Sequence, residues 1–170
     1  METLAVESKS LYNPLMSEIV KVQTLTQLEK RFEIRLPDDL SLDHKPGQFV
    51  EVSLFGFGEA PISISSSPTR TPTFDLTVRN VGRLTDKMHL LTEGNQLGIR
   101  GPFGNGFDVV PFKKKDMLFI CGGIGLAPLK SLIDYTIDIS WQNVHSLLLR
   151  NSNSAKPESY PSAVQQIRKI

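Results

Sequence analysis

The residues best suited to chemistry lie where an apolar run ends in a cluster of glycines. Cys121-Gly122-Gly123-Ile124-Gly125 separates the apolar run Met117–Ile120 from a helical pattern that begins at Leu126. Glycine lets a backbone approach a phosphate closely, and a helix start offers free N–H groups and the positive end of its dipole. This turn therefore predicts a dinucleotide site. Because Gly-x-Gly alone is a weak signal and Pro128 replaces the third glycine of the common fingerprint, a tight turn without a ligand stays open as the alternative.

A second glycine-to-helix turn lies upstream, at Val81-Gly82-Arg83-Leu84-Thr85. A helix start here would offer N–H groups and the Thr85 hydroxyl to a diphosphate, and Arg79 would add a charge-assisted contact. The alternative is that Thr85 only caps the helix and Arg79 only pairs with a surface carboxylate. The sequence leaves both interpretations open.

The elements that must position the upstream turn are short alternating runs, which predict an antiparallel barrel or sandwich. Apolar and polar residues alternate after Ile19 and again in five further runs, with Pro, Gly, Asn or Asp between them. These further runs are Phe32–Leu36, Phe49–Leu54, Ile62–Ser65, Phe74–Val78 and Leu97–Ile99. One helical pattern, Leu84–Leu91, interrupts them.

Beyond Pro111 the pattern changes to that of a strand, a helix and a second strand. Met117–Cys121 is apolar without alternation, which predicts a strand buried on both faces, as in a parallel sheet. Leu126–Ile139 follows as a helix and Val144–Leu149 as a second strand, which together predict a right-handed strand-helix-strand unit. The residues expected to face inward from the helix are Leu129, Leu132, Ile133 and Ile137. A last short helix is expected over Ser162–Ile170.

Four motifs in order resemble the ferredoxin-reductase-type flavoproteins, in which a flavin-binding Greek-key barrel precedes a pyridine-nucleotide domain. They are Ala60-Pro61-Ile62-Ser63, Arg79 with Gly82–Thr85, Gly101-Pro102-Phe103-Gly104, and Gly122–Pro128. The amino-acid sequence of Gly58–Pro68 looks most similar to that of the reductase subunits of multi-subunit hydrogenases and anaerobic sulfite reductases. The resemblance covers roughly residues 18–150.

The resemblance implies that the barrel binds FAD, that hydride passes from NADH or NADPH to flavin N5, and that electrons continue to a partner subunit. By position, Pro61, Ile62 and Ser63 would border the isoalloxazine, with the Ser63 hydroxyl near N5. Val78, Arg79 and Val81 would line the flavin and ribityl side, and Gly82, Leu84 and Thr85 would hold the diphosphate. Gly122, Gly123, Gly125, Ala127 and Pro128 would receive the nicotinamide nucleotide. The cofactor carries the chemistry, so no side chain need act as acid or base.

Two departures from the family pattern favour a less complete protein. Ala60 and Ile62 stand where the family often has an arginine and an aromatic ring, so Arg79 or Arg83 would have to compensate. No Asp or Glu lies about 20 residues beyond Gly122–Gly125 to bind a ribose. Arg150 is a candidate contact for a 2′-phosphate, with a solvated surface arginine as the alternative. We expect only the first part of a nucleotide domain, with a leader at 1–15, the barrel at 16–111 and the nucleotide unit at 112–170. The alternative function is a non-catalytic remnant or assembly subunit that retains the barrel.

Composition narrows the remaining function classes. The 170 residues carry 19 Lys+Arg and 18 Asp+Glu, so net charge gives no basic field for nucleic acid, and an oligonucleotide-binding barrel is disfavoured. The single cysteine, Cys121, excludes a disulfide framework within this chain and is interpreted as a small core residue. His44, His89 and His145 lack ligand spacing, so no metal is expected. With no signal sequence or apolar span, we expect a cytoplasmic protein.

Overall fold

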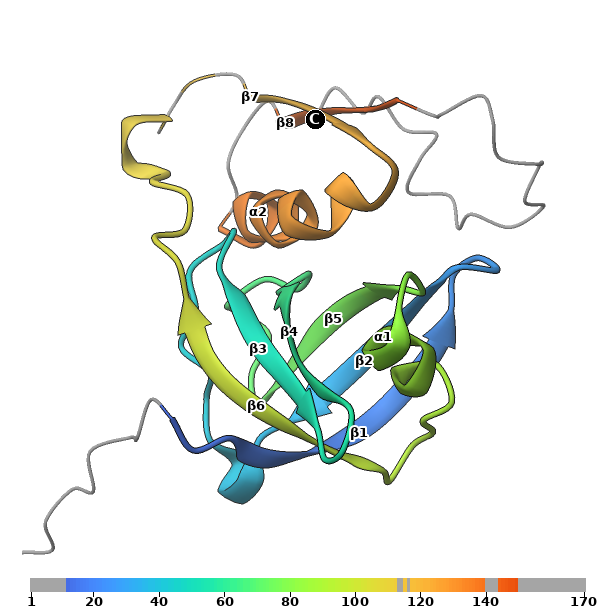
Figure 1. Cartoon of the computed structure of the whole chain (residues 1–170). Helices are drawn as coiled ribbons and strands as arrows, with labels where there is room; N and C mark the ends of the chain where they lie inside the picture. The colour runs from blue at the N-terminus through green and yellow to red at the C-terminus, as the bar shows by residue number, and fades with distance from the viewer. Residues whose placement is uncertain (1–11, 113–114, 116, 140–143, 150–170) are drawn as a thin grey trace, which may run out of the picture.

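In the computed structural model the chain forms a six-stranded antiparallel sheet followed by a small strand-helix-strand unit (Figure 1). The structure describes residues 12–112, 115, 117–139 and 144–149. Residues 1–11 of the predicted leader, the helix expected over 162–170 and Arg150 lie outside these residues, and the leader's last predicted residue, Leu15, already belongs to the first strand. In the part of the chain that is described, no helix is long and apolar enough to cross a membrane.

The six strands confirm the predicted antiparallel class. They are β1 Leu15–Thr24, β2 Glu29–Arg35, β3 Phe49–Leu54, β4 Gly58–Ser63, β5 Thr73–Arg79 and β6 Gln96–Phe103. Their order in the sheet is β4-β3-β6-β1-β2-β5. Each neighbouring pair is antiparallel, with Phe32 opposite Leu76 and Val52 opposite Ile99. Helix α1, Arg83–Met88, lies between β5 and β6 in sequence, where the helical pattern predicted it.

The expected closure of the barrel is only partly correct, because β4 and β5 form no continuous ladder. The sheet curls so that these two edge strands approach each other, and they are linked by one isolated bridge, Ile64 with Leu76. Pro61 has no N–H to donate to a neighbouring strand. It is tolerated here because β4 lies at the edge of the sheet. We call β1–β6 with α1 the barrel.

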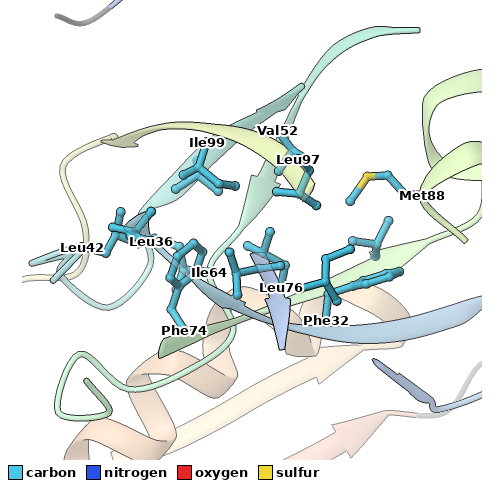
Figure 2. Close-up of a cluster of buried hydrophobic side chains, with 14 residues drawn as sticks. Phe32, Leu36, Leu42, Val52, Ile64, Phe74, Leu76, Met88, Leu97 and Ile99 are labelled. Atoms are coloured by element: carbon cyan, nitrogen blue, oxygen red, sulfur yellow. The ribbon is translucent and has the colours of Figure 1, made fainter. Parts of the chain in front are cut away.

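The barrel encloses one apolar core, built from the inward positions of the alternating strands (Figure 2). Phe32, Ile34 and Leu76 are fully buried, and Met88 enters the same cluster from α1. Because successive strand side chains point to opposite faces, this alternation also fixes which residues point outward. Ile62 packs against the core, whereas Pro61 is exposed on the other face of β4.

The C-terminal unit consists of β7 Met117–Gly122, α2 Leu126–Asp138 and β8 Val144–Leu149. β7 and β8 pair in parallel, as the pattern predicted, and α2 lies between this small sheet and one end of the barrel (Figure 1). The expectation that β7 is buried on both faces is wrong. Phe119 is buried, but Leu118 and Ile120 are 63% and 55% exposed, because α2 packs against only one face of the sheet.

Helix α2 also differs from its predicted inward face. Leu132 is buried as expected, and Leu129 and Ile133 are half-buried, but Ile137 is 51% exposed. Two polar side chains, Ser131 and Thr136, are instead fully buried. Part of the helix surface therefore packs against polar groups, which a pattern of apolar residues cannot reveal.

Candidate functional site

The β4 segment of the predicted flavin site divides between the two faces of the strand. Pro61 is exposed and Ser63 is half-buried, while Ile62 between them packs on the barrel core. Ser63 lies opposite Phe49 of β3, which in turn lies opposite Phe103 of β6. The end of β4 is thus brought next to the predicted barrel-exit motif, so that two of the four sequence motifs lie at one end of the sheet.

The barrel-exit motif packs against the chain itself. The rings of Phe49 and Phe103 are tilted with centroids 5.9 Å apart. Gly47, at φ +86°, leaves room for Phe107, since a Cβ on Gly47 would lie 2.4 Å from the Phe107 ring. The rings of Phe103 and Phe107 therefore both pack against the protein itself.

The end of β5 passes from the core to the surface. Val78 is fully buried in the core, and its carbonyl accepts a hydrogen bond from the His89 ring at 3.0 Å, whereas Val81 is 75% exposed. The Arg79 guanidinium lies 3.5 Å from the Glu29 carboxylate. Asn80, between Arg79 and Val81, has a buried Oδ1 with no hydrogen-bond partner among the described residues. Sequence reasoning missed Asn80, and an isolated asparagine gives no signal that would have found it.

The Thr85 hydroxyl holds the turn before α1. It accepts hydrogen bonds from the N–H groups of Val81 and Gly82, both at 3.0 Å, and donates to the Gly82 carbonyl at 2.9 Å. The capping interpretation of Thr85 is thereby confirmed. Its contact with a diphosphate stays a prediction, in which the backbone N–H groups that follow Gly82 would act as the donors.

Both arginines that were expected to compensate for the missing arginine at position 60 already have contacts within the protein. Arg79 pairs with Glu29 as described, and Arg83 donates to the Gly56 carbonyl at 3.3 Å while its guanidinium lies 5.7 Å from the centroid of Phe57. Both side chains are partly exposed, and both lie beside the turn that starts α1. A ligand phosphate would have to compete with these contacts.

The glycine turn before α2 is the other predicted phosphate site, and the space beside its glycines is open. β7 ends at Gly122, and Gly123–Gly125 forms one 3₁₀ turn that leads into α2. A Cβ added at Gly123 or Gly125 would have no atom from elsewhere in the described chain within 4 Å, although Gly123 at φ +54° favours glycine for its backbone. Ala127 is buried and Pro128 half-buried, so they shape the helix start from inside.

Gly98 of β6 contrasts with these turns. A Cβ at Gly98 would lie 2.2 Å from the Ser53 hydroxyl and 2.8 Å from the Pro14 Cβ, so that glycine is required by packing. At Gly82 and Gly125 the space beside the backbone is open. Open space beside a glycine at a helix start is what a phosphate group needs in order to reach the N–H groups.

Two surface hollows lie away from both candidate turns, and neither is lined by a predicted cofactor residue. The larger of the two has a volume of about 270 Å³ and is lined in part by Met16, Arg35 and Gln96.

Burial raises the pKa of the Cys121 thiol, which keeps it protonated and unreactive. Over the described ranges, no group of three or more His, Cys, Asp or Glu residues could hold a metal ion.

Comparison with known proteins places these motifs in a family context. No protein-family model matches the chain. The chain is 45% identical over 130 residues to the sulfhydrogenase 2 gamma subunit of Pyrococcus furiosus, a match that covers 75% of this chain and 45% of that protein. It is 43% identical over 96 residues to a probable dihydroorotate dehydrogenase B (NAD⁺) electron transfer subunit of Methanothermobacter thermautotrophicus, covering 56% of this chain and 35% of that subunit.

A solved structure gives the same assignment. An NADH-dependent reduced ferredoxin-NADP oxidoreductase superposes with a TM-score of 0.68 and 26% identity, covering 79% of this chain and 48% of the other. The chain spans less than half the length of these three proteins. The chain is therefore a homologue of sulfhydrogenase gamma subunits and of dihydroorotate dehydrogenase B electron transfer subunits, with the fold of ferredoxin-reductase-like FAD/NAD-binding domains.

Proposed function

We propose that this chain is an FAD-binding electron-transfer module that takes electrons from NADH or NADPH and delivers them to a partner subunit. The observation that carries the proposal is the pair of helix starts at Gly82 and Gly125, each with open space beside its glycine. Similarity to a sulfhydrogenase gamma subunit and to a dihydroorotate dehydrogenase B electron transfer subunit supports the same assignment. A cytoplasmic location and the division of the chain after residue 111 remain part of this proposal.

The residues present fit a flavin nucleotide on the barrel side. The backbone N–H groups of Arg83 and Leu84, which follow Gly82, would hold the diphosphate, with the side chains of Arg79 and Arg83 as neighbouring cations. The orphaned Asn80 Oδ1 would accept a hydrogen bond from a ligand hydroxyl, since a buried acceptor without a partner costs free energy. Ser63, at the end of β4, would lie beside the reactive part of the ring system.

The glycine turn before α2 would bind the pyrophosphate of NAD(P)H through the N–H groups that start the helix. When bound, FAD would accept a hydride from NAD(P)H and, with a proton from solvent, become FADH₂, from which a partner removes two electrons and solvent takes two protons. The chain's own residues would orient the two nucleotides and would supply no acid or base.

Two alanine variants test the proposal, because added methyl groups at these positions contact nothing in the protein. Gly82→Ala should weaken FAD binding by about tenfold or more, by pushing a phosphate away from the N–H groups. Gly125→Ala should leave FAD binding unchanged and weaken NAD(P)H binding by a similar factor. FAD binding is measured by flavin fluorescence, and reduction by anaerobic titration with NADH and NADPH. Wild-type protein that neither binds FAD nor gains thermal stability with it would refute the proposal.

A second candidate function is a non-catalytic assembly subunit. The exposed apolar face of β7, with Leu118 and Ile120, favours it, because such a surface suits contact with another protein. Under this alternative, FAD-loaded protein would bind its partner but would not oxidise NADH or NADPH with an artificial electron acceptor. Turnover under these conditions would exclude it.

A further inference from the structure

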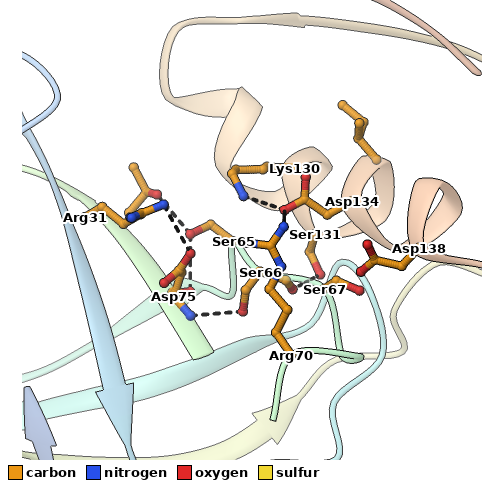
Figure 3. Close-up of polar contacts among 12 residues, drawn as sticks. Arg31, Ser65, Ser66, Ser67, Arg70, Asp75, Lys130, Ser131, Asp134 and Asp138 are labelled. Atoms are coloured by element: carbon orange, nitrogen blue, oxygen red, sulfur yellow. Dashed lines mark hydrogen bonds and ion pairs between the residues drawn. The ribbon is translucent and has the colours of Figure 1, made fainter. Parts of the chain in front are cut away.

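Helix α2 contacts the barrel through a polar face. Ser131, fully buried, donates from Oγ to the Ser66 carbonyl at 2.6 Å. One turn later, Asp134 lies 3.5 Å from the Arg70 guanidinium, and a further turn on, Asp138 accepts a hydrogen bond from Thr69. Residues 131, 134 and 138 share one helix face, which meets the loop between β4 and β5 (Figure 3).

The helix partly pre-orders this face. Lys130 donates to the Asp134 carboxylate at 2.5 Å, an i,i+4 pair that holds the carboxylate against α2. The hydrogen bond from Thr69 lowers the pKa of Asp138, so this carboxylate is ionised and remains an acceptor at neutral pH. The contact therefore consists of a buried neutral hydrogen bond at Ser131, followed along the helix by charge-assisted contacts at Asp134 and Asp138.

The barrel side of the contact is also held in place. The Ser66 carbonyl accepts a second hydrogen bond from the ring of His44 at 3.1 Å, and the Ser66 hydroxyl accepts from the Asp75 N–H at 2.9 Å. Ser65 donates from its N–H to the Asp75 carbonyl at 2.8 Å. Ser65, Ser66 and Ser67 are all at most 1% exposed. Residues 65–67 are therefore a buried, hydrogen-bonded part of the barrel end, whereas Thr69 and Arg70 are exposed.

We call residues 65–70 together with Ser131, Asp134 and Asp138 the interlock. Ser66 follows Ser63, the candidate flavin contact, by three residues, and Ser131 follows Gly125, the candidate nucleotide contact, by six residues on the same helix. Each candidate binding segment is thus joined to the interlock by a short structured stretch of chain.

We propose that the interlock sets the separation of the two binding segments, which makes Ser131 and Asp134 positioning residues for NAD(P)H-dependent flavin reduction. This inference rests on the proposed function. Hydride transfer needs the two reacting atoms about 3–3.5 Å apart, and misplacement by about 1 Å can cost about a hundredfold in rate. A helix that moves relative to the barrel would therefore slow reduction without weakening FAD binding to the barrel.

The kinetic test compares Ser131→Ala combined with Asp134→Asn against Thr136→Val. Thr136 is equally buried on the same helix, but its hydroxyl bonds only the Ile133 carbonyl of that helix, at 2.8 Å. In stopped-flow experiments at saturating NADH or NADPH, the double variant should reduce bound FAD at least about tenfold more slowly. Its FAD dissociation constant should stay within about twofold of the wild type, and Thr136→Val should change neither quantity. Equal reduction rates in all three folded proteins would overturn the proposal.

A distance measurement tests the interlock without any cofactor. Nitroxide labels at Leu28→Cys in the barrel and Ile137→Cys on α2, both exposed sites, in a Cys121→Ser background report the separation of the two parts by pulsed electron resonance. The double variant should broaden the distance distribution, whereas Thr136→Val should not. An unchanged distribution would overturn the interlock even if the wild type reduces flavin. A broadened distribution would support it even if the wild type fails to react with NAD(P)H, a failure that refutes only the proposed function.

Discussion

The barrel and the β7–α2–β8 unit bury their apolar side chains in different ways. In the barrel, 14 apolar residues from five strands, α1 and the connecting loops form one core, and most of them are at most 2% exposed. In the C-terminal unit, β7 places Phe119 against α2 but leaves Leu118 and Ile120 on an uncovered face. The barrel is stabilised mainly by its own core, whereas the unit relies on one covered face and on polar contacts with the barrel. Four sets of substitutions would break or sharpen this contrast.

The largest effect is expected in the barrel core. Phe32→Ala removes a fully buried ring at the centre of β2 and should lower the free energy of unfolding by about 3–5 kcal/mol, through lost burial and a residual cavity. Urea unfolding followed by circular dichroism measures the change. A loss below about 1 kcal/mol would mean that the barrel does not depend on this core.

The two helix starts should respond differently to changes at their caps. Thr85→Val removes the hydroxyl that caps α1 and should cost about 1–2 kcal/mol in urea unfolding, because two N–H groups lose their acceptor. Thr85→Ser keeps the hydroxyl and should recover most of the loss. The start of α2 has Gly125 at its cap position with no side-chain hydrogen bond, so Gly125→Ala should change stability much less. Equal losses of unfolding free energy for Thr85→Val and Gly125→Ala would contradict the contrast.

The junction between the two regions should be sensitive to acid through His44. Burial lowers the pKa of His44 below its ordinary value of about 6.5, and the Ser66 carbonyl and Asp43 only partly oppose this shift. The folded protein therefore disfavours the proton more than the unfolded chain does. The stabilisation is complete above about pH 6.5 and is lost as the pH falls through the folded pKa.

The measurement is the melting temperature of the wild type and His44→Gln between pH 8 and pH 5. The wild type should lose about 1–3 °C more than the variant on the acid side, and the difference between the two proteins should be constant above pH 7. Parallel curves over the whole range would show that His44 does not titrate at this junction.

The smallest effect is expected on the outer face of β7. Leu118→Thr and Ile120→Thr place a β-branched residue of high strand propensity at each position and should change the free energy of unfolding by less than about 0.5 kcal/mol, since both residues are exposed. A loss above about 1 kcal/mol for either variant would show that this face is covered in solution and would remove the contrast with the barrel.

Most of the fold followed from periodicity. The alternation in Phe32–Leu36 and Phe49–Leu54 predicted strands at β2 and β3, and the glycines before Leu126 predicted the turn into α2. The same reasoning failed at Leu118 and Ile120, because an apolar run shows that a strand can be buried but does not show what lies on each of its faces.

The candidate site was only partly predictable. The sequence indicated the two glycine turns, and the structure shows open space beside Gly82 and Gly125. The sequence left Thr85 open between a cap and a phosphate contact, and the hydrogen bonds within residues 81–85 show the cap. The orphaned Asn80 Oδ1 became apparent only from the folded chain, because a local sequence pattern does not show which polar atoms are buried without a partner.

The sequence by itself determined the strands, the two helix starts and the family motifs, because backbone preferences and side-chain alternation act over a few neighbouring residues. Only the tertiary structure decided that Ser131, Asp134 and Asp138 face the loop at 65–70, a contact between segments more than 60 residues apart. Such a contact leaves no periodic signal, since a serine or an aspartate on a helix has the same local pattern whether it meets solvent or a buried carbonyl.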